Sequence, residues 1–364
     1  MARIVYGVSG EGSGHSSRAR EVAGHLVAGR HEVKIASYDR GYANLSGDFD
    51  VIEIEGLTIG TRDNVVSPLR TVTRNLRRVP GGWRSLRRLR RAMREFEPHV
   101  VLTDFEPLSA YLAGGLDLPL VSVDNQHRMR YMVHPVPRRL RRDALVTKAV
   151  IRMMVPRPCL SYVTTFWFGE VKNDRTRLFP PILRRAVREA RPTRGEHVLV
   201  YVTKAFEPML NALRAHPDTP FRCYGFEREG QEGHLSFRPF SLDGFLADLA
   251  SSRAVIGTAG FTLITESLHL GKPYLANPMA GQFEQQLNAL LLEDIGRGRN
   301  LQGPPTPEAV GDFLAAADEL ARGGTAAAGD PCAILQAMDE LVADDAALAH
   351  EAHERRRRRR RRSA

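Results

Sequence analysis

The sequence predicts an α/β protein built from two Rossmann-like, doubly wound domains that face a cleft. Two observations lead to this fold class: short apolar strand patterns alternate with helical patterns in both halves, and in each half a Gly-rich turn follows a strand and precedes a helix. Such alternation is typical of parallel sheets covered by helices on both faces. A chain of 364 residues with 43% hydrophobic content is large enough for two cores. We expect domains at residues 1–183 and 184–350, followed by a disordered Arg-rich tail at 351–364.

The N-terminal half opens with a β-α-β unit. Arg3–Val8 is a short apolar strand, the turn Gly10–His15 is rich in glycine, and from Ser16 apolar residues recur at helical spacing until Gly29. Further strands are predicted at Glu32–Ala36, Val51–Ile54, Val100–Thr103, Leu120–Val123 and Ser161–Thr165, with helices at Trp83–Phe96 and Pro107–Gly114.

A second α/β set follows the polar stretch Arg184–Glu196. Its strands are predicted at His197–Val202, Arg222–Tyr224, Ala254–Ile256 and Pro273–Leu275, with helices near Glu207–Arg214, Leu242–Ala250, Phe261–Leu270 and Phe283–Asp294. After a Gly/Ala-rich segment at 323–329, a closing helix is predicted at Cys332–Val342. The sequence does not decide on which domain this helix packs.

Cysteine content and hydropathy exclude several classes of protein. Cys159, Cys223 and Cys332 lack the short paired spacing of a disulfide framework or a zinc site, which fits a reducing compartment. The longest apolar stretch, Ala144–Phe168, is interrupted by charged residues and prolines, so it fits neither a signal peptide nor a membrane-spanning helix. We therefore expect a cytoplasmic protein.

The net charge of +10 is concentrated at one end of the chain. Eight positive charges belong to the run Arg355–Arg362, which leaves +2 for the remainder. A run of like charges is typical of a solvated tail, and aromatic RNA-binding motifs are absent from the sequence. We do not expect nucleic-acid binding to be the main function.

The loop after the first strand is built to face a polar or anionic ligand. Glycines at positions 10, 12 and 14 let the backbone approach a ligand, and the helix that follows points its positive end there. The alternative is a tight turn with no ligand; the spacing is not the dinucleotide fingerprint. His15 closes this loop, where an imidazole is suited to take a proton from an attacking hydroxyl. Its alternative is a capping or packing role.

The segment Gly257–Pro278 offers a second ligand-facing turn. A strand ends at Ile256, glycines stand at 257 and 260, and Glu266 lies inside the helix that follows. Free amides at the start of such a helix suit a diphosphate, and a carboxylate suits ribose hydroxyls. An ordinary βαβ turn with a solvated Glu266 is the alternative.

That segment, continued through Gly281-Gln-Phe-Glu-Gln-Gln-Leu-Asn-Ala, resembles the donor-binding signature of GT-B glycosyltransferases. The resemblance is to the group that contains MurG, monogalactosyldiacylglycerol synthase and the UDP-glucuronosyl- and UDP-glucosyltransferases, and it indicates a poorly characterised branch. It also covers the loop Gly10–His15, with Gly12 and Gly14, and so implies an acceptor-side N-terminal domain and a C-terminal domain that binds the nucleotide sugar.

The resemblance also implies roles for individual residues. Glu266 would hold the ribose, Glu284 and Gln285 the transferred sugar, and His15 would be the catalytic base. Asp104 would orient His15 or act as the base itself; a helix N-cap is its alternative. The residues implied at the diphosphate are Ala259, Gly260, Phe261 and Thr262. Those implied at the nucleobase of the donor are Phe240, Ser241 and Arg184. The usual Gly-Ser phosphate turn is replaced by Val202–Ala205, where Thr203 stands in for it.

The resemblance implies transfer of a hexosyl group from a nucleotide-diphosphate sugar, a UDP-sugar above all, to an acceptor hydroxyl. No Asp-x-Asp motif follows the end of a predicted strand, so we expect no metal and no further cofactor, with helix N-termini and basic groups stabilising the leaving diphosphate. Direct displacement would invert the anomeric centre. The alternatives are a UDP-sugar 2-epimerase or hydrolase of the same fold, and a non-catalytic sugar-nucleotide or lipid-binding protein.

The sequence does not identify the acceptor. Arg70–Arg94 is dense in arginine with Leu and Trp interspersed, as in an amphipathic helix on an anionic membrane surface. A lipid-linked acceptor and a peripheral location on the inner membrane face would fit this reading. A solvated helix face in an Arg-rich protein fits the same residues equally well.

Overall fold

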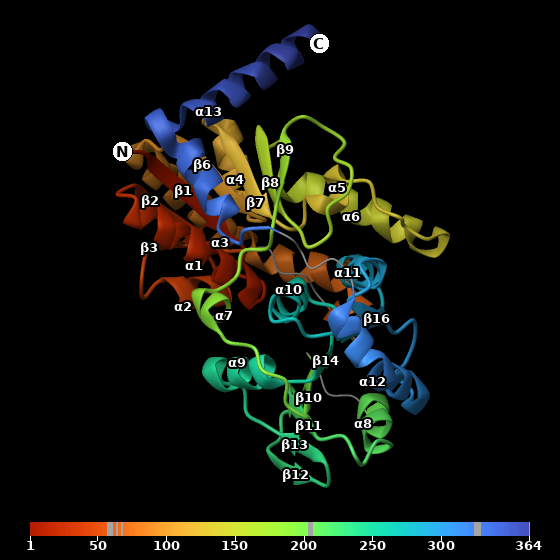
Figure 1. Cartoon of the computed structure of the whole chain (residues 1–364). Helices are drawn as coiled ribbons and strands as arrows, with labels where there is room; N and C mark the ends of the chain where they lie inside the picture. The colour runs from red at the N-terminus through yellow and green to blue at the C-terminus, as the bar shows by residue number, and fades with distance from the viewer. Residues whose placement is uncertain (57–60, 63–64, 67, 203–206, 324–328, 364) are drawn as a thin grey trace. The chain divides into compact units, whose positions relative to one another are not determined.

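The computed structural model (Figure 1) describes residues 1–364 apart from 57–60, 63–64, 67, 203–206, 324–328 and 364. The side chains of 61–62, 65–66, 68–80, 360 and 363 are also outside the description. The chain divides into two compact units, Met1–Arg184 with Gly329–Ala364, and Arg185–Ala328. The α/β class with two parallel-dominated sheets is as predicted.

The first unit contains a seven-stranded sheet whose paired strands are all parallel, in the order β3-β2-β1-β6-β7-β8-β9. The strands are β1 (Arg3–Val8), β2 (Glu32–Ser37), β3 (Asp50–Glu53), β6 (Val100–Asp104), β7 (Leu120–Asp124), β8 (Leu160–Thr164) and β9 (Thr176–Phe179). A separate two-stranded sheet pairs β4 (Thr61–Arg62) with β5 (Val65–Val66).

Helices cover both faces of this sheet. Apolar residues of α1 and α13 form one core with alternate residues of β1, β6 and β7, and those of α3 and α4 form another on the opposite face. The helices of this unit are α1 (Ser13–Ala28), α2 (Asp39–Leu45), α3 (Pro68–Phe96), α4 (Pro107–Gly115), α5 (Arg128–Tyr131), the 3-10 turn Arg138–Leu140, α6 (Arg141–Met154) and α13 (Ala333–Ser363).

The second unit repeats the pattern around a sheet of order β12-β13-β11-β10-β14-β15-β16, parallel except for the edge strand β12. Its strands are β10 (Val198–Tyr201), β11 (Phe221–Tyr224), β12 (Gly230–Glu232), β13 (Leu235–Phe237), β14 (Ala254–Gly257), β15 (Tyr274–Ala276) and β16 (Gly298–Asn300). Its helices are α7 (Arg185–Glu189), α8 (Glu207–Arg214), α9 (Leu242–Ser251), α10 (Phe261–His269), α11 (Phe283–Asp294) and α12 (Pro307–Arg322).

The closing helix belongs to the first unit. The sequence predicts one domain at residues 184–350, whereas Gly329–Ala364 lies with the N-terminal sheet. The reason is packing, because Ile334, Met338 and Leu341 of α13 are buried in the same core as β1 and α1.

The Arg-rich tail differs from the expected disorder at 351–364, because α13 continues to Ser363. The helix is interrupted at Ala343–Ala346, where the backbone leaves the helical region. Beyond that point Arg355 pairs with Glu351 one turn earlier, Arg357 reaches Asp117 at 2.6 Å and Arg359 reaches Asp174 at 3.0 Å. Pairs one helical turn apart support an exposed helix by a few tenths of a kcal/mol each, about 0.2–0.5.

No helix in the described part of the chain is long and apolar enough to cross a membrane.

Candidate functional site

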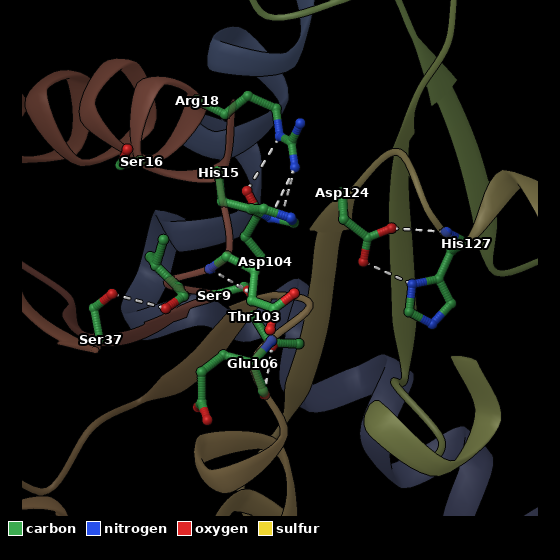
Figure 2. A network of polar contacts seen from close by, with 12 residues as sticks. Ser9, His15, Ser16, Arg18, Ser37, Thr103, Asp104, Glu106, Asp124 and His127 are labelled. Atoms are coloured by element: carbon green, nitrogen blue, oxygen red, sulfur yellow. Dashed lines mark hydrogen bonds and ion pairs between the residues drawn. The ribbon is translucent and has the colours of Figure 1, made fainter. Parts of the chain in front are cut away.

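A histidine and an aspartate meet at the carboxyl edge of the first sheet. Val8, the last residue of β1, is in register with Asp104, the last residue of β6. The chain enters α1 directly after β1, which brings His15 over this edge, and His15 Nδ1 lies 2.7 Å from Asp104 Oδ1 (Figure 2). In parallel sheets ligands collect at this edge.

Arg18 holds the same carboxylate from one turn further along α1. Its Nε donates to Asp104 Oδ2 at 3.1 Å and its Nη2 donates to Oδ1 at 2.8 Å. Burial alone would raise the pKa of Asp104, but the charges of Arg18 and His15 and their hydrogen bonds hold it below its usual value. Burial likewise opposes the Arg18 cation, yet Asp104 raises the pKa of Arg18. Asp104 is therefore an ionised, fully buried acceptor.

This ionisation sets the tautomer of His15. A carboxylate at 2.7 Å requires a proton on Nδ1, so in the neutral imidazole the lone pair is on Nε2. Arg18 Nη2 also lies 3.1 Å from Nδ1, but a protonated nitrogen cannot accept from it, so that contact is electrostatic. The His15 side chain is 12% exposed, whereas Asp104 is 0% exposed. Of these two side chains, His15 is the one that can present an acceptor atom to a ligand.

Asp104 is not a helix N-cap, which excludes that alternative. Glu106 caps α4 instead: its Oε1 accepts from Leu108 N at 2.6 Å and its Oε2 accepts from Ser109 N at 2.7 Å. Glu106 is completely buried, and this burial raises the pKa of its carboxyl group despite the amide donors. The two acids near the end of β6 thus have separate partners.

The glycines of the first loop divide into packing and turn positions. A Cβ on Gly10 would lie 2.0 Å from the backbone oxygen of Tyr38, so Gly10 permits close packing. Gly12 has a φ of +77° and is the N-cap of α1. The helix begins at Ser13 rather than at the predicted Ser16, which places Gly14 and His15 in its first turn. No side chain caps this turn and no acid stands in it, so it presents backbone N–H groups.

A similar helix start follows β14 in the second unit. Gly260 is the N-cap of α10 without a capping side chain, next to a buried Ala259 and Phe261 and a half-buried Thr262. Asn288 Nδ2 donates to Ala259 O at 2.8 Å and fixes this turn. Sequence reasoning missed that role, although Asn288 lies inside the quoted signature. Glu266, one turn into α10, is only 3% exposed rather than solvated.

Four more residues proposed for the donor, Phe240, Ser241, Glu284 and Gln285, lie elsewhere in the second unit. Phe240 is 58% exposed and its ring centroid lies 6.3 Å from that of Tyr201, while Ser241 Oγ caps α9 by accepting from Gly244 N at 3.2 Å. Glu284 is half-buried, and Gln285 Oε1 accepts from Met279 N at 3.0 Å. Arg184 is the last residue of the first unit, and Thr203 lies outside the described residues.

Lys272, within the Gly-Lys-Pro of the signature, has a structural role. Its Nζ donates to Ser252 O at 2.7 Å and to the backbone oxygen of Thr193. Burial lowers the pKa of Lys272 to about 8. This lysine ties the segment at Thr193 to the end of α9 rather than facing a phosphate.

Two features of the first unit were missed by sequence reasoning. Arg18 received no role, although its spacing of three residues from His15 puts both on one helix face. The pair Asp124–His127 at the end of the neighbouring strand β7 was not noticed at all, although an Asp that ends a strand three residues before a His was a readable signal. Among the described residues no group of three or more His, Cys, Asp or Glu side chains is arranged to hold a metal ion.

Comparison with known proteins identifies relatives along most of the chain. A family model described as glycosyl transferase family 1 matches residues 2–317. An uncharacterised glycosyltransferase of Methanosarcina mazei is 24% identical over 346 residues, covering 85% of this chain and 88% of its own length. A second, from Methanosarcina acetivorans, is 26% identical over 354 residues, with the same coverage.

Solved structures with the same fold include several glycosyltransferases. The glycosyltransferase of kitacinnamycin matches with a TM-score of 0.62 at 18% identity, covering 98% of both chains. Spinosyn forosaminyltransferase matches with a TM-score of 0.64 at 17% identity, covering 94% of this chain and 100% of its own. MurG of Acinetobacter baumannii matches with a TM-score of 0.57 at 15% identity, covering 88% and 94%.

Proposed function

The chain belongs to glycosyl transferase family 1, and we propose that it transfers a hexosyl group from a UDP-sugar to an acceptor hydroxyl, with inversion and without a metal ion. The single observation that carries this proposal is the oriented pair of His15 and Asp104, with Nδ1 and Oδ1 2.7 Å apart. A general base of this kind is what activation of a hydroxyl nucleophile requires.

The reaction would be a single displacement. The acceptor O–H gives its proton to His15 Nε2 as its oxygen bonds to the anomeric carbon, and the bond from that carbon to the diphosphate oxygen breaks. The electron pair leaves with UDP. Asp104 stabilises the imidazolium that forms, and attack from the face opposite the diphosphate inverts the anomeric centre.

Donor binding is assigned to the second unit. The uncapped N-terminus of α10, at Gly260–Thr262, would donate backbone hydrogen bonds to the diphosphate, and Glu266 would accept from the ribose hydroxyls. The exposed ring of Phe240, supported by Tyr201 and Phe245, would stack on the base. Glu284 and the amide nitrogen of Gln285 would contact the transferred hexose. These assignments follow the signature that resembles MurG and its relatives.

Metal independence would rest on the same proposed contacts. The charge that develops on the leaving diphosphate would be stabilised by the amides at the start of α10, which are fixed in place before the reaction. No step then needs a divalent ion or a further cofactor.

The acceptor would be lipid-linked and would be reached at an anionic membrane surface, with the protein peripheral on the inner face. Exposed side chains on α3 include Trp83, Arg87 and Arg91. On α6, apolar residues at helical spacing are exposed beside basic ones: Leu145, Val146 and Met153 with Arg141, Arg142 and Arg152. Exposed apolar and cationic residues on the same helices suit the headgroup region. The side chains of 70–80 are outside the description.

The experiment that tests the function is incubation of the purified protein with UDP-glucose, UDP-galactose, UDP-N-acetylglucosamine and a membrane extract. Release of UDP is followed by 31P NMR and the anomeric proton of the product by 1H NMR. UDP release that depends on the extract, with a product anomer opposite to the donor, is expected. Donor breakdown that ignores the extract would favour a hydrolase or epimerase, an alternative that family membership does not favour.

A further inference from the structure

A second His–Asp pair lies at the carboxyl edge of the first sheet. Asp124 ends β7, the strand next to β6; its Oδ2 lies 2.7 Å from His127 Nδ1, and its Oδ1 accepts the His127 backbone N–H at 2.8 Å. Both side chains are completely buried. Figure 2 shows this pair beside the His15–Asp104 pair. The charge of Asp124 also acts on Arg18, so the two pairs share one electrostatic neighbourhood.

The segment from Gln126 to His134 carries three buried acceptor atoms with no hydrogen-bond partner among the described residues: Gln126 Oε1, His127 Nε2 and His134 Nδ1. It also carries buried guanidinium nitrogens for which no hydrogen bond is found there, Arg130 Nη1 among them. In its neutral form His127 accepts at Nε2 because Nδ1–H is donated to Asp124. His134 accepts at Nδ1 because Nε2–H is donated to Arg128 O at 2.9 Å. Burial lowers the pKa of His134 to about 4, so it is neutral at pH 7.

Unmet acceptors in a protein interior are costly and rare, so three on one short segment require an explanation. The missing partner must donate to these acceptors and accept from Arg130 Nη1, as a hydroxyl group or water does and an ammonium group does not. The positive charges of Arg128, Lys172 and Lys148 all act on His134, and this field disfavours an ammonium group. Hydroxyl groups, of a ligand or of ordered water, suit this mixed set of acceptors and donors.

Flat side chains accompany the unmet acceptors. Tyr131 stacks on His127, with ring centroids 5.3 Å apart and an angle of 21° between the ring planes. The ring centroids of Trp167 and His134 are 5.4 Å apart. Small-molecule sites combine aromatic walls with a few orienting polar groups. Trp167, and Tyr131 once it has left the face of His127, suit the C–H faces of a six-membered ring, and the acceptors suit the hydroxyls at its rim.

We propose that the segment Gln126–His134 recognises the hydroxylated ring of the acceptor, a sugar or a cyclic polyol, whose hydroxyls donate to His127 Nε2 and Gln126 Oε1. This inference rests on the proposed function and adds the chemical class of its acceptor. A ring held at the end of β7 lies next to β6, where His15 would deprotonate one of its hydroxyls. Binding would displace Tyr131 from His127; α5, a single turn of four residues, has little local structure to oppose this.

The test is performed without donor, on protein labelled with 15N-histidine. The probes are methyl β-D-glucopyranoside and myo-inositol, and the matched control probe is the fully O-methylated glucoside, which has no hydroxyl donor. His127→Phe identifies the His127 signals. We expect the hydroxylated probes to shift the His127 Nε2 signal and the methylated one to leave it in place. Gln126→Leu should weaken the apparent affinity about three- to tenfold.

Control variants separate recognition from structure. His25 pairs with Asp339 at 2.8 Å on the surface of the same unit, so His25→Gln should leave probe affinity unchanged. An unmoved His127 signal at saturating hydroxylated probe, or an equal shift with the methylated glucoside, would overturn the proposal. Probe binding by a chain that consumes no UDP-sugar would refute the proposed function and retain this site. Donor consumption without probe binding would refute this site alone.

Discussion

Asp104 and Glu106, two residues apart at the end of β6, have carboxylates with opposite electrostatic settings. Asp104 is held by Arg18 and His15, which keep the pKa of its carboxyl low against the effect of burial, whereas burial raises the pKa of Glu106 although it accepts two amide N–H groups. Asp104 is thereby ionised and accepts a hydrogen bond from His15 Nδ1. Glu106 instead caps the start of α4.

The stabilities contributed by the two acids should therefore depend on pH in opposite directions. Asp104 has a lowered folded pKa, so its contribution is present above the unfolded value near 3.8 and is lost as the pH falls below it. Glu106 has a raised folded pKa, so its contribution is present below the unfolded value near 4.5 and is lost as the pH rises. Denaturation of Asp104→Asn and Glu106→Gln against the wild type from pH 3 to pH 7 measures both.

At pH 7, Asp104→Asn should cost about 3–5 kcal/mol, because the buried Arg18 cation loses its counter-charge. The difference in unfolding free energy between Asp104→Asn and the wild type should become smaller towards pH 3. A constant difference across this range would contradict the ionised state assigned to Asp104.

His15→Ala should lower transfer by about 10²–10⁴-fold, because it removes the proton acceptor. Donor affinity should change little, since the donor contacts are assigned to the second unit. Initial rates and calorimetric donor titration measure the two quantities. His25→Ala is the control, being another histidine of α1 with an aspartate partner, and it should retain full activity. Full activity of His15→Ala would remove the base assignment.

Much of this fold and part of this site could be predicted from sequence. Apolar runs such as Val100–Thr103 give the strands, and the Gly-rich loop after Val8 marks the sheet edge where His15 lies. Arg18 could not be selected as a second partner of Asp104, because the two residues are 86 positions apart and meet only through the pairing of β1 with β6. Likewise, the sequence does not show on which domain α13 packs, because this depends on which sheet face the other helices leave uncovered.

Glu266→Ala should weaken UDP-sugar binding by about ten- to a hundredfold, the effect of losing a charged acceptor for bound hydroxyls, on the order of 1.5–3 kcal/mol. Glu319→Ala, at an exposed position of α12 in the same unit, is the control and should bind normally. Isothermal titration with the UDP-sugar gives both affinities. Equal affinity for the wild type and Glu266→Ala would remove the ribose assignment.

Transfer should persist in excess EDTA, because α10 amides rather than a divalent ion are assigned to the diphosphate. The measurement compares initial rates with EDTA, Mg²⁺ or Mn²⁺ after extensive dialysis. Complete loss in EDTA with recovery in Mn²⁺ would overturn metal independence while leaving the family assignment intact.

The basic part of α3 should bind anionic vesicles. Trp83 is 60% exposed among arginines, and the chain has only one other tryptophan, the half-buried Trp167. Vesicles with phosphatidylglycerol should therefore shift the Trp83 emission to shorter wavelength, and phosphatidylcholine vesicles should not. Trp83→Phe should abolish the shift.

The run Arg355–Arg362 would also attract an anionic surface, so a control chain that ends at Glu354 is needed. If the Trp83 shift survives this truncation but is lost in the double variant Arg87→Glu/Arg91→Glu, α3 contacts the membrane. If vesicle binding disappears with the truncation, the attraction belongs to α13 and α3 is a solvated face.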